Sequence, residues 1–143
     1  MRRAAIAALV LVFIAFVGCD RGDEETSPVP HLYEDGLSIL PNPAPAYSEV
    51  TVFFPFYDHD GDVKNASVFV RLETETGDEI ELAPEEGTFE VLGDTNGAMS
   101  FDLKLGSQSE SQGTYYIYIV DEAGHRSNEI SEYLLVNPPE GEE

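Results

Sequence analysis

The stretch YDHDGDV, at residues 57–63, places three aspartates on alternate positions around one glycine. Asp58, Asp60 and Asp62 could supply carboxylate oxygens to calcium, which takes about six to eight hard oxygen ligands. An EF-hand is excluded, because the position that would need a bidentate glutamate is Phe69. Asp-Gly is also a common turn dipeptide, so the same stretch could be an acidic turn and nothing more.

The chain offers little else that resembles catalytic chemistry. Its single cysteine is Cys19, no serine lies in a G-x-S-x-G motif, and no glycine-rich loop could cradle a phosphate. His59 and His125 leave open a transition-metal site with imidazole and carboxylate ligands, although they lack the helical spacing of a zinc motif. Because no nucleophile, base and oxyanion site assemble from these residues, we expect no enzymatic activity.

The charge of the chain restricts its partners. Of 143 residues, 28 are acidic and 7 are basic, which gives a formal net charge of −21. A surface this negative repels nucleic acid and anionic lipid headgroups, and it attracts cations and basic partners. We therefore expect no nucleic-acid partner. Solubility alone is the alternative reason for such a charge.

The apolar residues of the central chain alternate with a period of two, which is typical of half-buried β-strands. No window predicts an amphipathic helix, and Gly- and Asn-rich turns separate the segments. Pro55 lies inside one of them and predicts a bulge or an edge position. The pattern predicts an all-β fold, an antiparallel sandwich of about seven strands. The strand segments are SEVTVFFPF, ASVFVRL, DEIELA, AMSFDLKL, TYYIYIV and NEISEYLLV, with weaker GLSIL and TFEVL.

Two stretches carry a resemblance to a known class of domain. VTVFFPFYDHDGDV and GTYYIYIVDEAGHRS resemble strand-and-turn units of bacterial extracellular Ig-like modules of the PKD and fibronectin III type. The resemblance implies an Ig-like sandwich with the strand order A, B, C, C′, E, F, G. The tryptophan common on strand C is absent, since the chain has none. Tyr115 or Tyr116 could be the tyrosine that pins the corner before strand F.

The implied strand order brings two acidic loops to the same end of the sandwich. The B–C loop holds the aspartates of YDHDGDV, and the F–G loop holds DEAGH. We therefore expect a calcium site with backbone carbonyls and water as further ligands. The alternative is that the F–G aspartate only accepts hydrogen bonds from its own turn. The four carboxylates expected at the calcium site are Asp58, Asp60, Asp62 and Asp121.

Strands C, F and G should share a sheet whose outer side is aromatic. If Tyr115 points inward, Tyr116 and Tyr118 point outward, because strand residues alternate between faces. An aromatic patch with an arginine resembles an interface core, or a platform for a sugar ring or a peptide. Cross-strand aromatic pairs also stabilise sheets without any partner. The expected binding face comprises Phe69, Arg71, Tyr116, Tyr118 and Tyr133.

The N-terminus is typical of a secretion signal. The basic residues MRR precede an apolar run at 4–17 that is too short for an ordinary spanning helix. FVGC then resembles the lipobox of bacterial lipoproteins, with Phe16 in place of the usual leucine. The resemblance implies that Cys19 is lipidated, with acyl chains such as palmitate, and anchors the chain in the lipid bilayer. An ordinary signal peptide with an incidental cysteine is the alternative.

Four segments follow from these patterns. We expect a lipoprotein signal peptide at 1–18, a lipidated cysteine and flexible acidic linker at 19–35, the sandwich at 36–137 and an acidic tail at 138–143. The protein should sit in the bacterial cell envelope as a non-catalytic, calcium-stabilised interaction module for an envelope protein or a glycan. A structural spacer and an accessory subunit of an envelope complex are the alternatives.

Overall fold

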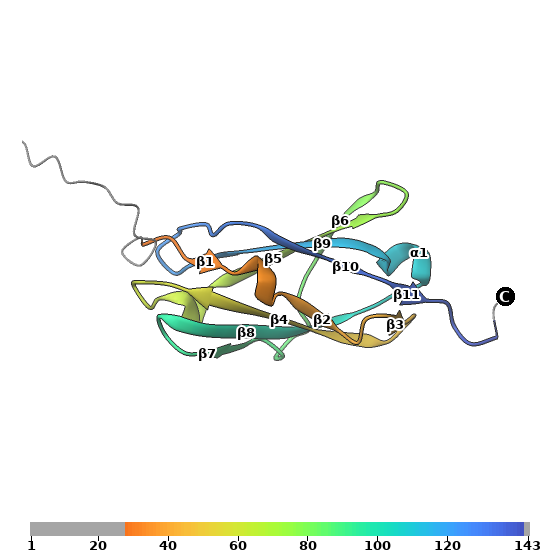
Figure 1. The fold of residues 1–143 in the computed structure, drawn as a ribbon, viewed down its shortest axis with the longest axis horizontal. Helices are drawn as coiled ribbons and strands as arrows, with labels where there is room; N and C mark the ends of the chain where they lie inside the picture. Colours follow the sequence, from red (N-terminus) through yellow and green to blue (C-terminus); the bar gives the residue numbers. More distant parts are fainter. Residues whose placement is uncertain (1–27, 142–143) are drawn as a thin grey trace, which may run out of the picture.

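The chain folds as an all-β sandwich of two antiparallel sheets packed face to face, which confirms the predicted fold class (Figure 1). The computed structural model describes residues 28–141. The first sheet, of order β1-β4-β8-β7 with β2 also on β4, contains β1 (His31–Leu32), β2 (Ser38–Leu40), β4 (Glu49–Tyr57), β7 (Glu90–Leu92) and β8 (Asn96–Lys104). The second, of order β10-β9-β5-β6, contains β5 (Ser67–Thr74), β6 (Glu79–Leu82), β9 (Gly113–Val120) and β10 (Ile130–Leu134). A separate parallel pair joins β3 (Ala44–Pro45) to β11 (Val136–Asn137).

The alternating apolar residues form the core between the two sheets. Because successive strand residues face opposite sides, every second side chain of β4 and β9 points inward. Phe54 on β4 and Tyr115 on β9 are fully buried. Phe54 meets Phe101 of β8 edge to face, with ring centroids 6.3 Å apart. For β4 and β9, the period-two pattern therefore predicted both the strand and the residues that it buries.

The strands predicted as C, F and G share a sheet, since β9 pairs with β5 on one side and β10 on the other. Of the two candidate corner tyrosines, Tyr115 is the one that bonds back. Its buried hydroxyl donates to the Ser111 carbonyl at 2.7 Å. This bond fixes the chain where it enters β9 after α1 (Gln108–Ser111).

Pro55 lies at a local edge, as the sequence predicted. On one side it pairs with Ala98 of β8. On the other side, β2 covers β4 only as far as Phe53, and β1 begins to cover it at Phe56. A residue without an N–H group fits this gap, because no strand there needs a donor from it. The 3₁₀ turn η2 (Glu34–Gly36) spans the gap between β1 and β2.

The sandwich begins earlier than predicted. Residues 31–35 were expected within the flexible linker, but His31–Leu32 form β1 and pair with Tyr57 and Phe56 of β4. Leu32 is buried in the core. The prediction was wrong here because a strand of two residues is too short to show a period.

Two further differences lie near the C-terminal half. The segment NEISEYLLV divides into β10 and β11, which belong to different sheets. The short helix α1 was not predicted, although Ser107 and Glu110 form a capping box at its start. Four residues are too few for an amphipathic pattern to be visible in the sequence.

The predicted signal peptide, Cys19 and the start of the linker lie outside the described residues, so they stay predictions. The acidic tail is described only as far as residue 141. Within residues 28–141, no helix has the length and apolar character needed to cross a membrane.

Candidate metal centre and binding face

The two acidic loops meet at one end of the sandwich, as the strand order implied. One loop connects β4 to β5, and the other connects β9 to β10. The backbone N–H of Glu122 donates to the Asp62 carbonyl at 3.4 Å. The Asn65 amide donates to the Glu122 carboxylate at 3.3 Å. The loops are therefore in contact, with a small number of long hydrogen bonds between them.

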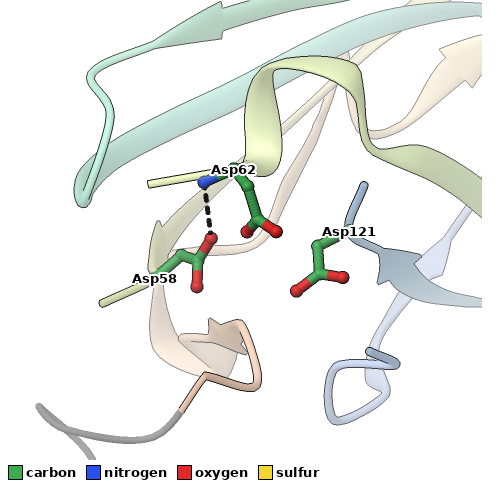
Figure 2. Close-up of side chains that lie close together, drawn as sticks. All are labelled: Asp58, Asp62 and Asp121. Atoms are coloured by element: carbon green, nitrogen blue, oxygen red, sulfur yellow. Dashed lines mark hydrogen bonds between the residues drawn. The ribbon is translucent and has the colours of Figure 1, made fainter. Parts of the chain in front are cut away.

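Asp58, Asp62 and Asp121 converge at this contact. One carboxylate oxygen from each lies within 4.8 Å of the other two, and Figure 2 shows the three carboxylates directed toward a common space. Asp60 was expected as a fourth ligand, but it is exposed and lies outside this group. The three aspartates occupy alternate positions, but the backbone turns at Asp60 and Gly61, so their side chains do not all point to the same side.

The tight turn after β4 sets the directions of the first two carboxylates. The Gly61 N–H donates to the Asp58 carbonyl at 3.2 Å, and Gly61 has φ +68, a conformation that glycine adopts without strain. The Asp62 N–H donates to Asp58 Oδ2 at 3.1 Å. Val63, which begins the turn η3 (Val63–Asn65), is fully buried and ties this loop to the core.

The F–G loop orients Asp121 through His125. The His125 backbone N–H donates to Asp121 Oδ1 at 2.7 Å, and His125 Nδ1 lies 3.0 Å from Asp121 Oδ2. The two roles expected for Asp121, a metal ligand or a cap of its own turn, are therefore compatible, because a carboxylate oxygen accepts more than one interaction. His59 is exposed, and neither histidine belongs to the group of three ligand atoms.

The cluster is short of positive charge and of hydrogen-bond donors. Asp58 is fully buried, yet its Oδ1 has no partner, and neither has Asp62 Oδ1. Across residues 28–141 these are the only buried side-chain polar atoms without a hydrogen-bond partner. Burial raises the pKa of Asp58 from its ordinary value of 3.8 to about 6, and the Asp62 carboxyl adds to the rise. The nearby Lys64 ammonium instead pairs with Asp94 at 2.8 Å.

The second candidate site lies on the outer side of the sheet formed by β5 and β9. Phe69 and Tyr118 are cross-strand partners whose rings stack with centroids 4.8 Å apart and an interplanar angle of 8°. The Arg71 guanidinium lies 4.2 Å from the centre of the Tyr116 ring. The Arg126 guanidinium lies 3.8 Å from the centre of the Tyr118 ring. Tyr116 and Tyr118 are only half-buried, so this side faces outward as expected.

A groove of about 610 Å³ lies beside the stacked rings. Phe69, Arg71 and Tyr118 line it, whereas Tyr116 and Tyr133 do not. Tyr133 pairs with Thr114, away from the stack, and its hydroxyl donates to Glu75. Arg126 was not predicted, because it lies in a loop where no period marks its direction. The other lining residues are Val68, Val70, Glu81, Leu82, Ala83, Pro84, Arg126 and Glu129.

Comparison with known proteins identifies no family for this chain. No protein-family model matches the chain, and no curated protein matches it. Among solved structures, the archaellum periplasmic stator complex of FlaF and FlaG from Sulfolobus acidocaldarius is 14% identical, with a TM-score of 0.41 over 73% of this chain and 87% of that chain. FlaG from the same organism is 12% identical, with a TM-score of 0.36 over 73% of this chain and 97% of that chain. Similarity at this level carries no functional argument, and the PKD or fibronectin III assignment stays a prediction.

Proposed function

We propose that this protein is a non-catalytic interaction module of the cell envelope, anchored through lipid on Cys19, which binds a segment of another envelope protein. The binding site is the groove beside Phe69 and Tyr118. Its volume of about 610 Å³ is within the range of ligand-binding clefts. Phe69 is 44% exposed at its margin and stacks on the Tyr118 ring, so aromatic surface at the groove is open to a partner.

The backbone beside the groove supports a protein partner rather than a glycan. β6 pairs with β5 only from Val70 to Glu73, so the first residues of β5 extend past the end of β6. A free strand edge next to apolar pockets is the arrangement that binds extended peptide segments. Pro84 lines the groove where the chain leaves β6.

Arg71 and Arg126 lie at the margin of the groove, and each is close to a glutamate. Arg71 pairs with Glu79 at 2.9 Å, and Arg126 lies 3.8 Å from Glu129. Interface centres are enriched in aromatic residues and arginine, which matches Phe69, Tyr118 and Arg126. The alternative function is a structural spacer or an accessory subunit that uses another surface.

A photo-crosslinking residue placed at Phe69 in living cells tests the proposal. Phe53 is the matched control, since it is 40% exposed on β4 of the opposite sheet. We expect a discrete protein adduct from position 69, none from position 53, and loss of the adduct when Arg126→Ala is added. The same adducts from both positions would favour the spacer. An adduct at position 69 that is a glycan would change the class of partner.

A further inference from the structure

We propose that Asp58, Asp62 and Asp121 form a binding site for a hard divalent cation, and that Ca²⁺ is the ion that fits it. The site lies at the loop end of the sandwich, and none of its residues lines the groove. It therefore does not depend on the proposed function of the groove.

Two oxygens without hydrogen-bond partners distinguish this site from an ordinary cluster of acidic residues. Asp58 is fully buried and belongs to the group of three converging carboxylates, and its Oδ1 has no hydrogen-bond donor. Asp62 Oδ1 is also buried and also has no hydrogen-bond partner. Buried polar atoms almost always have a partner, because leaving one unpaired costs free energy. The only two exceptions in residues 28–141 belong to two of these three aspartates, and a cation bound between the carboxylates could satisfy both.

The spacing of the oxygens fits calcium. A Ca–O distance is about 2.3–2.6 Å, so two oxygens on one ion can be separated by up to about 5 Å. One oxygen from each aspartate lies within 4.8 Å of the other two, a span close to that of oxygens shared by one calcium ion, so a small inward movement would bring all three into contact with it (Figure 2). Magnesium binds at about 2.0–2.1 Å, which limits that separation to about 4 Å and would require stricter geometry. The all-oxygen donor set does not favour zinc, which prefers nitrogen and sulfur.

The ion would link the two sheets. Asp58 and Asp62 follow β4 of the first sheet, whereas Asp121 follows β9 of the second. The two hydrogen bonds between these loops, at 3.3 and 3.4 Å, are long. His125 acts as a positioning residue, because its backbone and ring nitrogens hold both oxygens of Asp121. Calcium would thus supply the main connection between the loops.

Calorimetric titration of CaCl₂ into the full chain, purified in mild detergent and stripped with a chelator, tests the site. We expect one calcium ion per chain, and a melting temperature that rises by several degrees at millimolar Ca²⁺. Asp62→Asn should weaken calcium binding by at least about tenfold. The matched control is Asp60→Asn, which removes the same charge from the exposed tip of the same turn and should leave the affinity within about twofold.

Three results would overturn the proposal. The first is the absence of both binding heat and a melting shift at millimolar Ca²⁺ in the unmodified chain. The second is equal weakening by Asp60→Asn and Asp62→Asn, which would indicate diffuse attraction by the net charge. The third is Mg²⁺ affinity equal to Ca²⁺ affinity, which would contradict the assignment of the ion. Circular dichroism of each variant confirms that the sandwich is folded, so that lost binding reflects the lost ligand.

Discussion

Asp58 is the residue of the acidic loops whose burial costs the most free energy of folding. It is fully buried, one of its oxygens accepts the Asp62 N–H, and the other has no partner. Asparagine has nearly the same shape and no charge. It could keep the bond from the Asp62 N–H and donate its own amide toward the Asp62 carboxylate. The residue therefore opposes folding when no cation is present, and the substitution measures that opposition.

Asp58→Asn should raise the melting temperature of the chelator-treated protein at about pH 7. The folded-state pKa of Asp58 is about 6, above its ordinary 3.8, so the carboxyl holds its proton more tightly in the folded state. The stability that the protonated carboxyl provides is complete below about pH 4 and is lost as the pH rises through about 6. The advantage of the variant should therefore shrink between about pH 7 and pH 5. Thermal melts of both proteins across this range check the prediction; a constant difference would contradict it.

Tyr115→Phe should lower the free energy of unfolding by about 1 kcal/mol, since it removes a buried hydrogen bond to the Ser111 carbonyl. Urea unfolding measures the loss. Tyr116→Phe on the same strand is the control, because its hydroxyl bonds to exposed Glu73. That change should stay within about 0.5 kcal/mol. Equal losses in the two variants would indicate that the corner bond has no special role.

At the scale of elements, the long strands were predictable from the sequence, and the very short strands were not. Period-two alternation marked β4, β5, β8 and β9 because each packs one face against the core. The two-residue strand β1 shows no such period, and only its pairing with β4 reveals it. The same limit applies to the site. Topology predicted that the acidic loops meet, but only the turn geometry distinguishes Asp62, which points inward, from Asp60, which is exposed.

The contact between Gly36 of η2 and Pro55 of β4 should not accommodate a larger side chain at position 36. A Cβ atom at Gly36 would lie 2.2 Å from Cγ of Pro55, far inside van der Waals contact. Gly36→Ala should therefore destabilise the sandwich by about 1–3 kcal/mol in urea unfolding. Adding Pro55→Ala removes the opposing ring, so the double variant should lose less than the sum of the two single changes. Additive losses would show that the clash is relieved elsewhere.

At the scale of the whole molecule, the net charge limits how the protein could attach to a membrane. A chain with a net charge of −21 is repelled by anionic headgroups, so the proposed attachment would depend on the lipid at Cys19 and not on a basic patch. Two of the four basic residues in the described chain, Arg71 and Arg126, lie at the groove. Glu81 and Glu129 also line the groove, so its charges are mixed on an otherwise acidic chain. The sequence did not predict this concentration, because Arg126 lies in the loop after β9 and only the fold of that loop brings it beside Tyr118.

Cys19→Ser should release the protein from the membrane. The lipobox resemblance implies acyl chains on this residue, and these are the membrane attachment that we propose. Metabolic labelling with a palmitate analogue should be lost, and the chain should move to the soluble fraction on cell fractionation. The Asp60→Asn chain serves as the labelled control. Retention of the label in Cys19→Ser would contradict the anchor.

The short strand β1 also has a mechanical consequence. The side-chain amide of Asn128, in the F–G loop, holds both the N–H and the carbonyl of Leu32, at 2.7 and 2.8 Å. β1 itself belongs to the first sheet, whereas the F–G loop belongs to the second (Figure 1). Tension applied to the chain ahead of residue 31 would thus be shared between both sheets at the point of entry. The force would act at the end of the sandwich where Asp121 lies. There the hydrogen bonds between Asn128 and Leu32 would have to break before β1 could separate from the sandwich.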